Sequence, residues 1–213
     1  MIPHRTPFFL PWLYPSLKWR MKAEKTVYLT FDDGPVPGPT EFVLETLSKS
    51  AIPATFFSIG DNIQKHPELF RRILTSGHTV GNHTVNHLNG WRTKTEKYLE
   101  NIKAFDPIAA MADHCQATLL FRPPYGCITR KQILSLKDYD IIMWDVLSQD
   151  YDHKLSPEKC VRRTMQACRP GSIIVFHDSY KSQRNMEYTL PRLIDFLGQK
   201  EYAFGAIPPR RKI

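Results

Sequence analysis

Short apolar segments alternate with longer amphipathic segments from residue 26 onward in this chain of 213 residues. Residues 27–31 are rich in β-branched and aromatic side chains and stop at Asp32-Asp33-Gly34-Pro35, which is typical of a strand that ends in a turn. The next segment, 40–50, has apolar residues near helical spacing, with Thr40 as its expected N-cap. Strands that alternate with helices predict a parallel sheet of βαβ units, and hence an α/β fold. The same criteria predict strands at 54–59, 79–81, 119–121, 141–146, 172–176 and 202–206, and helices at 63–76, 95–112 (interrupted at Pro107), 129–136, 157–167 and 189–197.

The strand expected at 172–176 lacks the polar alternation of a half-exposed strand, so both of its faces should be covered. A barrel, closed or partly closed, and an open doubly wound sheet both fit this pattern. In either fold the reactive groups belong at the C-terminal ends of the strands. The length suits one domain, which we expect over residues 26–213, after an N-terminal extension of residues 1–25.

Residues 8–17 are apolar and aromatic but are interrupted by Pro11 and Pro15. The segment is shorter than the roughly 20 residues of a membrane-spanning helix, and no small-residue cleavage site marks a signal peptide. We expect the four aromatic side chains of this segment to pack on the domain; they are Phe8, Phe9, Trp12 and Tyr14. The alternative is an anchor in a membrane surface, because basic residues follow at Lys18, Arg20 and Lys22. The compartment stays open, with the cytoplasm as the default and association with the cell envelope as the alternative.

The net charge of +8 arises from 29 Lys and Arg against 21 Asp and Glu. The basic residues are spread in pairs such as 71–72 and 162–163, with one cluster at 210–212, and no basic run is interleaved with aromatics. We therefore interpret the charge as a solvated surface and do not expect nucleic acid as a partner. No two cysteines have the Cys-x-x-Cys spacing of a zinc or redox site, so we expect free thiols at Cys115, Cys127, Cys160 and Cys168.

Polar and ionisable side chains follow five of the expected strands. Because the carboxyl ends of parallel strands meet at one rim, these groups should lie together. They are Asp32 and Asp33, His83 and His87, Arg122 and Tyr125, Asp145, and His177 with Asp178.

The spacing of His83 and His87 places both imidazoles on one face if the segment forms a helical turn. Two histidines at this spacing are by themselves a weak signal, and two surface histidines are the plainer interpretation. A carboxylate at a neighbouring strand end strengthens the prediction, because two histidines and one carboxylate leave an open position on a Zn²⁺-type ion. Such an ion can polarise a carbonyl and lower the pKa of a water molecule.

Asp32 and Asp33 are adjacent, so on an extended chain their side chains point in opposite directions. One can ligate a metal while the other faces an attacking water as general base. The alternative is an ordinary turn, for which Asp-Asp-Gly-Pro is also suitable. Among the other strand-end residues, His177 suits a general acid, Arg122 can orient a carboxylate, and Tyr125 can present a backbone N–H to an oxyanion. For His177 the plainer alternative is a histidine bound to a backbone carbonyl, and for Arg122 it is a surface ion pair.

The run Thr30-Phe31-Asp32-Asp33-Gly34-Pro35 resembles the signature of the polysaccharide deacetylases with a NodB homology domain, carbohydrate esterase family 4. The stretches 83–87 (HTVNH), 122–125 (RPPY) and 176–178 (FHD) resemble three further motifs of the family, in the family's order. The resemblance covers residues 26–206. It implies a distorted (β/α) barrel, usually of seven strands, and a hydrolase that removes N-acetyl groups from a carbohydrate.

The resemblance also implies the site. Asp33, His83 and His87 would hold a divalent metal, commonly Zn²⁺, with Co²⁺ or Ni²⁺ in relatives. The catalytic group would be Asp32 as the general base, Arg122 as its tether, Tyr125 as the oxyanion donor through its N–H, and His177 as the acid. The expected partner is an N-acetylated glycan, and the expected oligomeric state is a monomer.

One motif departs from the family. Alignment through Trp144 puts Leu147 at the aspartate of the fourth motif, which supports the catalytic histidine, and Tyr151 at its tryptophan. Asp145 or Asp150 can replace that aspartate. In the fifth motif Val175 stands for the usual leucine, a change that affects only an acetyl-sized pocket. Two other functions stay open, a hydrolase of small non-glycan amides and a carbohydrate-binding relative without activity.

Overall fold

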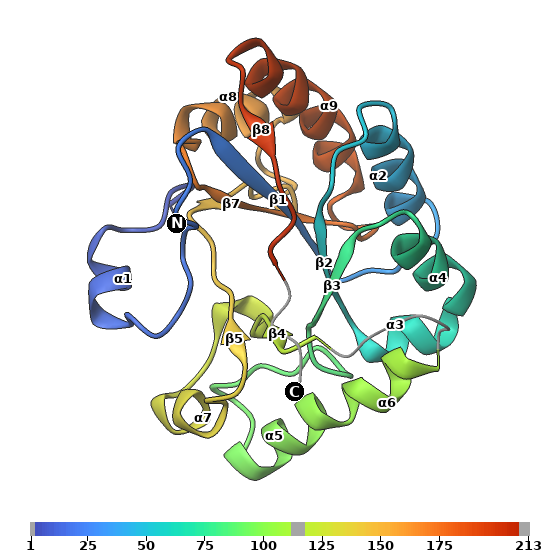
Figure 1. The fold of residues 1–213 in the computed structure, drawn as a ribbon, viewed down its shortest axis with the longest axis vertical. Helices are drawn as coiled ribbons and strands as arrows, with labels where there is room; N and C mark the ends of the chain where they lie inside the picture. The colour runs from blue at the N-terminus through green and yellow to red at the C-terminus, as the bar shows by residue number, and fades with distance from the viewer. Residues whose placement is uncertain (1–2, 112–117, 209–213) are drawn as a thin grey trace.

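The computed structural model describes residues 3–111 and 118–208, and Cys115 and the basic cluster at 210–212 lie outside this part of the chain. Its strands form one curled parallel sheet in the order β5-β4-β3-β2-β1-β7-β6, with β8 paired to the start of β1. Figure 1 shows the helices arranged around the outside of the strands. The expected α/β fold, a distorted (β/α) barrel of seven parallel strands, is confirmed. The strands are β1 (Thr26–Asp32), β2 (Thr55–Ser58), β3 (Thr79–Asn82), β4 (Leu120–Phe121), β5 (Asp140–Ile141), β6 (Val146–Leu147), β7 (Ile173–His177) and β8 (Ala203–Phe204).

The expected strand at 141–146 is wrong in one respect, because the chain there contributes two short strands rather than one. Residues 140–141 pair with β4, and residues 146–147 pair with β7 on the other side of the barrel. The segment therefore crosses from one edge of the curled sheet to the other. Between the two strands its backbone bonds elsewhere, for example from Met143 N to Lys18 O at 2.8 Å.

The helices follow the predicted order, with boundaries set by proline and by caps. The segment expected as one helix at 63–76 is two helices that meet at Pro67, and the segment at 95–112 breaks at Ala104 rather than at Pro107. Pro107 lies in the first turn of the second helix, where its missing N–H costs no hydrogen bond. The helices are α1 (Phe9–Leu13), α2 (Pro39–Ser48), α3 (Gly60–Lys65), α4 (Pro67–Thr75), α5 (Thr95–Lys103), α6 (Phe105–Ala110), α7 (Arg130–Ser135), α8 (Pro157–Ala167) and α9 (Gln183–Gln199), with a 3₁₀ turn η1 (Pro124–Gly126).

Thr40 does not cap α2, as the sequence had suggested. The N-cap is Gly38, whose φ of 86° favours glycine, and whose N–H donates to Glu41 Oε2 at 2.9 Å. The hydroxyl of Thr40 donates instead to Asp178. Side chains cap α7 and α8, since Thr129 Oγ1 accepts from Gln132 N and Ser156 Oγ accepts from Lys159 N.

The main core lies between the strands and their covering helices. In β7 residues 173–176 are buried, as expected for a strand covered on both faces. Phe31 stacks between Phe56 and Phe176, with ring centroids 5.1 and 6.0 Å away, so aromatic contacts join β1 to both of its neighbours. In the described part of the chain, no helix has the length and apolar character needed to cross a membrane.

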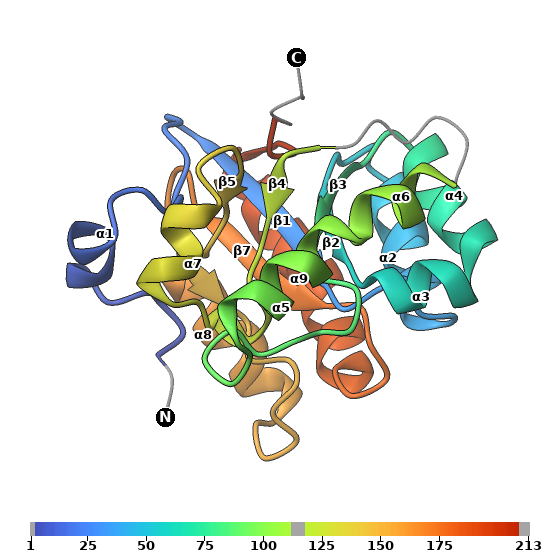
Figure 2. The same cartoon turned by 90° about the horizontal axis from the view of Figure 1, so that it is seen from below.

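The N-terminal extension runs along the crossing segment. Leu147 N donates to His4 O, Thr6 N donates to Asp145 O, and Lys18 N donates to Ile141 O, each at 2.8–2.9 Å. Figure 2 shows α1 at one side of the molecule, outside the ring of strands. The division into an extension of residues 1–25 and a domain of residues 26–213 stays a prediction.

The aromatic side chains of that extension do not all pack on the domain. Tyr14 is half-buried in a small apolar cluster, whereas Phe8 is 92% exposed and Trp12 is 81% exposed. The helix α1 has only five residues, contains Pro11 and ends before Pro15, and it buries none of its residues. The expected packing therefore does not extend to Phe8 and Trp12.

Among the described cysteines, Cys127, Cys160 and Cys168 are free thiols. Burial raises the pKa of Cys160 and that of Cys168 to about 12, so both thiols stay protonated at neutral pH. These cysteines are therefore packing groups.

Candidate active site

The C-terminal ends of the strands gather the predicted residues around one cavity. Asp32 ends β1 and pairs in register with His177 at the end of β7. His83 directly follows β3, and Arg122 directly follows β4. The cavity has a volume of about 400 Å³, and its walls include Asp32, Asp33, His83, His87, Tyr125 and His177. The expectation that these groups share one rim is therefore confirmed for all of the predicted metal ligands.

Asp33, His83 and His87 bring one donor atom each to within 4.8 Å of one another. Asp33 Oδ1 lies 3.2 Å from His87 Nε2 and 3.7 Å from His83 Nε2. The two histidines are not on a helical turn, because Thr84 and His87 have φ values of 65° and 54° and the segment is irregular. These left-handed residues fold the chain back, so that the two rings lie 5.1 Å apart.

Three observations test whether these donors fit a divalent ion. Asp33 Oδ1 is buried and accepts no well-formed hydrogen bond from the residues that the structure describes. His83 Nδ1 must donate to the carbonyl oxygen of Arg122 at 2.8 Å, which leaves Nε2 without a proton. Burial lowers the pKa of His83 to about 4, so the ring is neutral at physiological pH. A buried carboxylate oxygen without a hydrogen bond and a neutral imidazole nitrogen are suitable ligands for a metal.

Arg122 is fully buried and fixes Asp32 in place. Its Nη1 donates to Asp32 Oδ1 at 2.6 Å and to Thr30 Oγ1 at 2.8 Å. Its Nε donates to the carbonyl of Ile142 and its Nη2 to that of Met143, and the guanidinium lies 4.1 Å from the Phe57 ring centroid. A surface ion pair is thereby excluded for Arg122, because a guanidinium with this many fixed partners has one allowed position.

His177 donates two hydrogen bonds to the carboxylate of Asp150. Asp150 Oδ1 accepts from His177 Nδ1 at 2.7 Å, and Asp150 Oδ2 accepts from the His177 backbone N–H at 2.8 Å. Although burial opposes the charged ring, the carboxylates of Asp150, Asp33 and Asp32 raise the pKa of His177 to about 9.

Of the two candidates for the missing fourth-motif aspartate, the structure selects Asp150. Asp145 binds Arg169 at 2.6 and 2.9 Å and Ser172 at 2.7 Å. Leu147, at the aligned position, instead lines the cavity.

Tyr125 lies on the turn η1 that follows β4, with a φ of 60°. Its side chain is 63% exposed, and its hydroxyl is 3.0 Å from His87 Nδ1. The phenol therefore contacts the outer of the two histidines. Sequence reasoning had considered only the backbone of Tyr125 and missed this contact.

Asp178 has no predicted role, although it follows His177 directly. It is fully buried, and its carboxyl accepts hydrogen bonds from Gly34 N at 3.0 Å and from the Thr40 hydroxyl. Burial raises the pKa of Asp178 to about 8. A Cβ atom on Gly34 would lie 1.9 Å from Asp178 Oδ2, so only glycine allows this approach. The contact ties the loop after Asp32 and Asp33 to the end of β7.

A curled parallel sheet with this set of donors at its C-terminal rim defines a (β/α)-barrel hydrolase with a candidate divalent-metal site. Residues 20–144 match the family model described as polysaccharide deacetylase. The chain belongs to the polysaccharide deacetylase family and is by class a carbohydrate N-deacetylase. The family expected from the motifs is thereby confirmed.

Individual relatives agree with this assignment. The chain is 34% identical over 188 residues to a peptidoglycan-N-acetylglucosamine deacetylase of Bacillus cereus, which covers 86% of this chain and 87% of that protein. It is 34% identical over 164 residues to a chitooligosaccharide deacetylase of Bradyrhizobium, which covers 75% of this chain and 74% of the relative. A crystal structure of a peptidoglycan N-acetylglucosamine deacetylase superimposes with a TM-score of 0.87 at 29% identity and covers 95% of each chain.

Proposed function

We propose that this protein hydrolyses the N-acetyl group of N-acetylglucosamine units in peptidoglycan. The observation that carries the proposal is the convergence in one cavity of three metal-type donors, a tethered aspartate and a carboxylate-backed histidine. The choice of peptidoglycan rests on the names of the relatives that match most of the chain. In the reaction water adds to the acyl carbon, the C–N bond breaks, and acetate and a free amine leave.

Asp33, His83 and His87 would hold the metal, for which Zn²⁺ is the first choice and Co²⁺ or Ni²⁺ are alternatives. When bound, a divalent ion supplies a Lewis acid for the acyl oxygen and lowers the pKa of water. His83 is held for this role by the Arg122 carbonyl, and His87 by the Tyr125 hydroxyl.

Asp32 takes the proton of the attacking water in this proposal. Arg122 binds Asp32 Oδ1 from inside the protein, so the carboxylate keeps one orientation while it lines the cavity. The Tyr125 backbone N–H donates to the oxyanion of the tetrahedral intermediate. Donors of this kind typically contribute a factor of about 10²–10³ in rate.

His177 gives its proton to the departing amine. Because Nδ1 is bound to Asp150, the proton comes from Nε2, and the raised pKa keeps the ring charged at neutral pH. Asp150 thus acts through His177, as a positioning residue.

An apolar wall of the cavity suits the methyl group of an acetamide. Trp144, Leu147, Tyr151 and Val175 line it, and the Tyr151 ring meets the His177 ring edge-on at 5.1 Å. Leu147, at the position where the family has an aspartate, keeps this wall apolar. An acyl group larger than acetyl would have to displace these side chains.

The test is acetate release from N-acetylglucosamine oligomers and from peptidoglycan, measured together with the metal content of the protein. We expect activity to disappear after chelation and to return with Zn²⁺ or Co²⁺. Asp32→Asn should lower the rate at least 100-fold and leave the metal content unchanged. Undiminished acetate release by Asp32→Asn would refute the assigned base, and hydrolysis of small amides without any hydrolysis of oligomers would refute the glycan substrate.

A further inference from the structure

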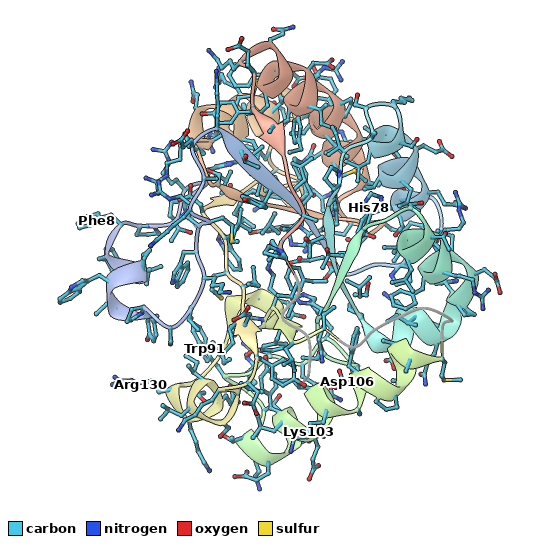
Figure 3. All side chains as sticks on the ribbon, in the orientation of Figure 1. Phe8, His78, Trp91, Lys103, Asp106 and Arg130 are labelled. Carbon is cyan, nitrogen blue, oxygen red and sulfur yellow. The ribbon has the colours of Figure 1, made fainter. Side chains whose placement is uncertain are left out.

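Five large apolar side chains are exposed on one face of the molecule, where α1 lies beside α7. Phe8, Phe9, Trp12 and Leu13 are 92%, 46%, 81% and 52% exposed, and Leu134 on α7 is 65% exposed. Figure 3 shows Phe8 projecting away from the molecule at the α1 side, with Arg130 on the neighbouring α7. Exposed apolar groups that cluster in this way mark an interaction site. We define the α1–α7 face by the five apolar residues and Arg130.

The two helices form one continuous surface. A shallow groove of about 250 Å³ lies between them, lined by Leu13 to Ser16 on one side and by Arg130, Ile133 and Leu134 on the other. Below the groove, Leu10, Tyr14 and Ile133 pack on a small core that contains Leu17 and Trp19. The face is therefore held in position by buried neighbours while its outer side chains meet solvent.

The charge of the face is basic. Residues 1–23 and α7 contain no Asp or Glu, and they contain six Lys or Arg. Two of the lysines are paired with acids outside these segments, Lys18 with Asp140 and Lys131 with Glu96. Arg130 has no ion pair with any residue that the structure describes. An apolar patch beside a free guanidinium complements a surface that is apolar inside and anionic outside.

We propose that the α1–α7 face docks on a membrane surface that contains anionic lipids. Phe and Trp side chains partition into the region between head groups and acyl chains, and Lys and Arg bind the anionic head groups. With five residues, α1 is far too short to span a bilayer, so it lies in the interface.

The docked molecule keeps its cavity near the lipid. Arg130 follows Tyr125 by five residues, which limits the distance between their Cα atoms to about 18 Å. The rim of the active site and the lipid-binding face are thus joined by one short loop, which includes Cys127 and Thr129.

The test is co-sedimentation of the full chain with vesicles of phosphatidylcholine alone or with one third phosphatidylglycerol. We expect binding to the anionic vesicles, weaker binding to the neutral ones, and loss of binding as salt is raised. The double variant Phe8→Ser/Trp12→Ser should bind at least tenfold more weakly, and Arg130→Gln about fivefold more weakly. Met111→Ser removes an apolar side chain that is 78% exposed just after α6, and as the matched control it should bind like the wild type.

Three outcomes would overturn the proposal. The first is equal binding of the double variant and the wild type, and the second is equal binding to neutral and anionic vesicles. The third is a wild-type dimer in solution that does not bind vesicles and that the double variant abolishes, which would assign the face to a second copy of the chain. The thermal unfolding midpoint is measured for every variant. If that of the double variant is lowered, the single variant Phe8→Ser is compared with the wild type in the same vesicle assay.

Discussion

Asp150 holds His177 by both of its carboxylate oxygens, one bound to the ring and one bound to the backbone of the same residue. The ring can neither flip nor swing without breaking a buried charge-assisted hydrogen bond. The bond also favours the charged ring, so the same contact fixes the position of the proton and the pKa at which it is lost.

Asp150→Asn should move the alkaline limit of deacetylation to lower pH. The reactive form of His177 is the protonated one, so activity falls as the pH rises through its pKa, which the nearby carboxylates raise to about 9. Removing one charge lowers that pKa by about one unit or more. The measurement is kcat/KM against pH, with Asp145→Asn as the control, because Asp145 is bound to Arg169 instead. An alkaline limb that stays in place in Asp150→Asn would contradict the assignment of His177 as the acid.

Arg122→Lys should lower kcat/KM at least tenfold although the charge is kept. A lysine cannot bind Asp32, Thr30 and two backbone carbonyls at once, so the Asp32 carboxylate loses its fixed orientation. Arg122→Met should destabilise the fold by about 3–5 kcal/mol, because it leaves a buried charge without a partner. Steady-state kinetics and urea unfolding measure the two effects. Lys131→Gln, which breaks an exposed pair with Glu96, should change the unfolding free energy by less than about 1 kcal/mol.

Gly34→Ala should destabilise the loop that carries Asp32 and Asp33, because its Cβ would overlap with Asp178 Oδ2. In the background of Asp178→Ala the same substitution should cost less, since the carboxyl is gone. The double-mutant cycle should give a coupling of about 1–3 kcal/mol in the unfolding free energy. Gly198→Ala is the matched control, because nothing lies within 4 Å of its Cβ position in α9, and it should be neutral or slightly stabilising. Additive effects at Gly34 and Asp178 would show that the contact does not hold the loop.

Zn²⁺ should raise the unfolding midpoint of the wild type, because a ligand that binds only the folded state stabilises it. Asp33→Asn and His83→Ala should abolish that rise and the bound metal together, since each removes one of three donors. The measurement is thermal unfolding with and without Zn²⁺, combined with elemental analysis. His153→Gln, outside the donor set, should keep the response of the wild type. A full zinc response in Asp33→Asn would place the metal elsewhere.

The sequence was sufficient for the fold class and for most of the groups at the rim. Asp145 is the exception, because it precedes β6 and binds Arg169 and Ser172 at the opposite end of β7. Strand and helix periods alternate clearly, and the residues at the end of a strand need no long-range information to be recognised. Asp33, His83 and His87 could be named in this way, although the local geometry was different, because left-handed residues at Thr84 and His87 replace the helical turn that the spacing suggested.

The choice between Asp145 and Asp150 could not be made from the sequence. They are five residues apart, and only the crossing of residues 140–147 from β4 to β7 decides which of them meets His177. The same holds for Thr40, which is a residue type that often caps helices but donates to Asp178, just after β7 and 138 residues away along the chain.

The amino-acid sequence by itself determined the order of the strands and helices and the chemical groups at the strand ends, because both depend on neighbours along the chain. The tertiary structure decided which carboxylate binds which base, how buried each group is, and which aromatic side chains stay exposed at the N-terminus. Those properties depend on pairs of residues that are far apart in the chain, and burial and pKa follow from the packing that brings them together.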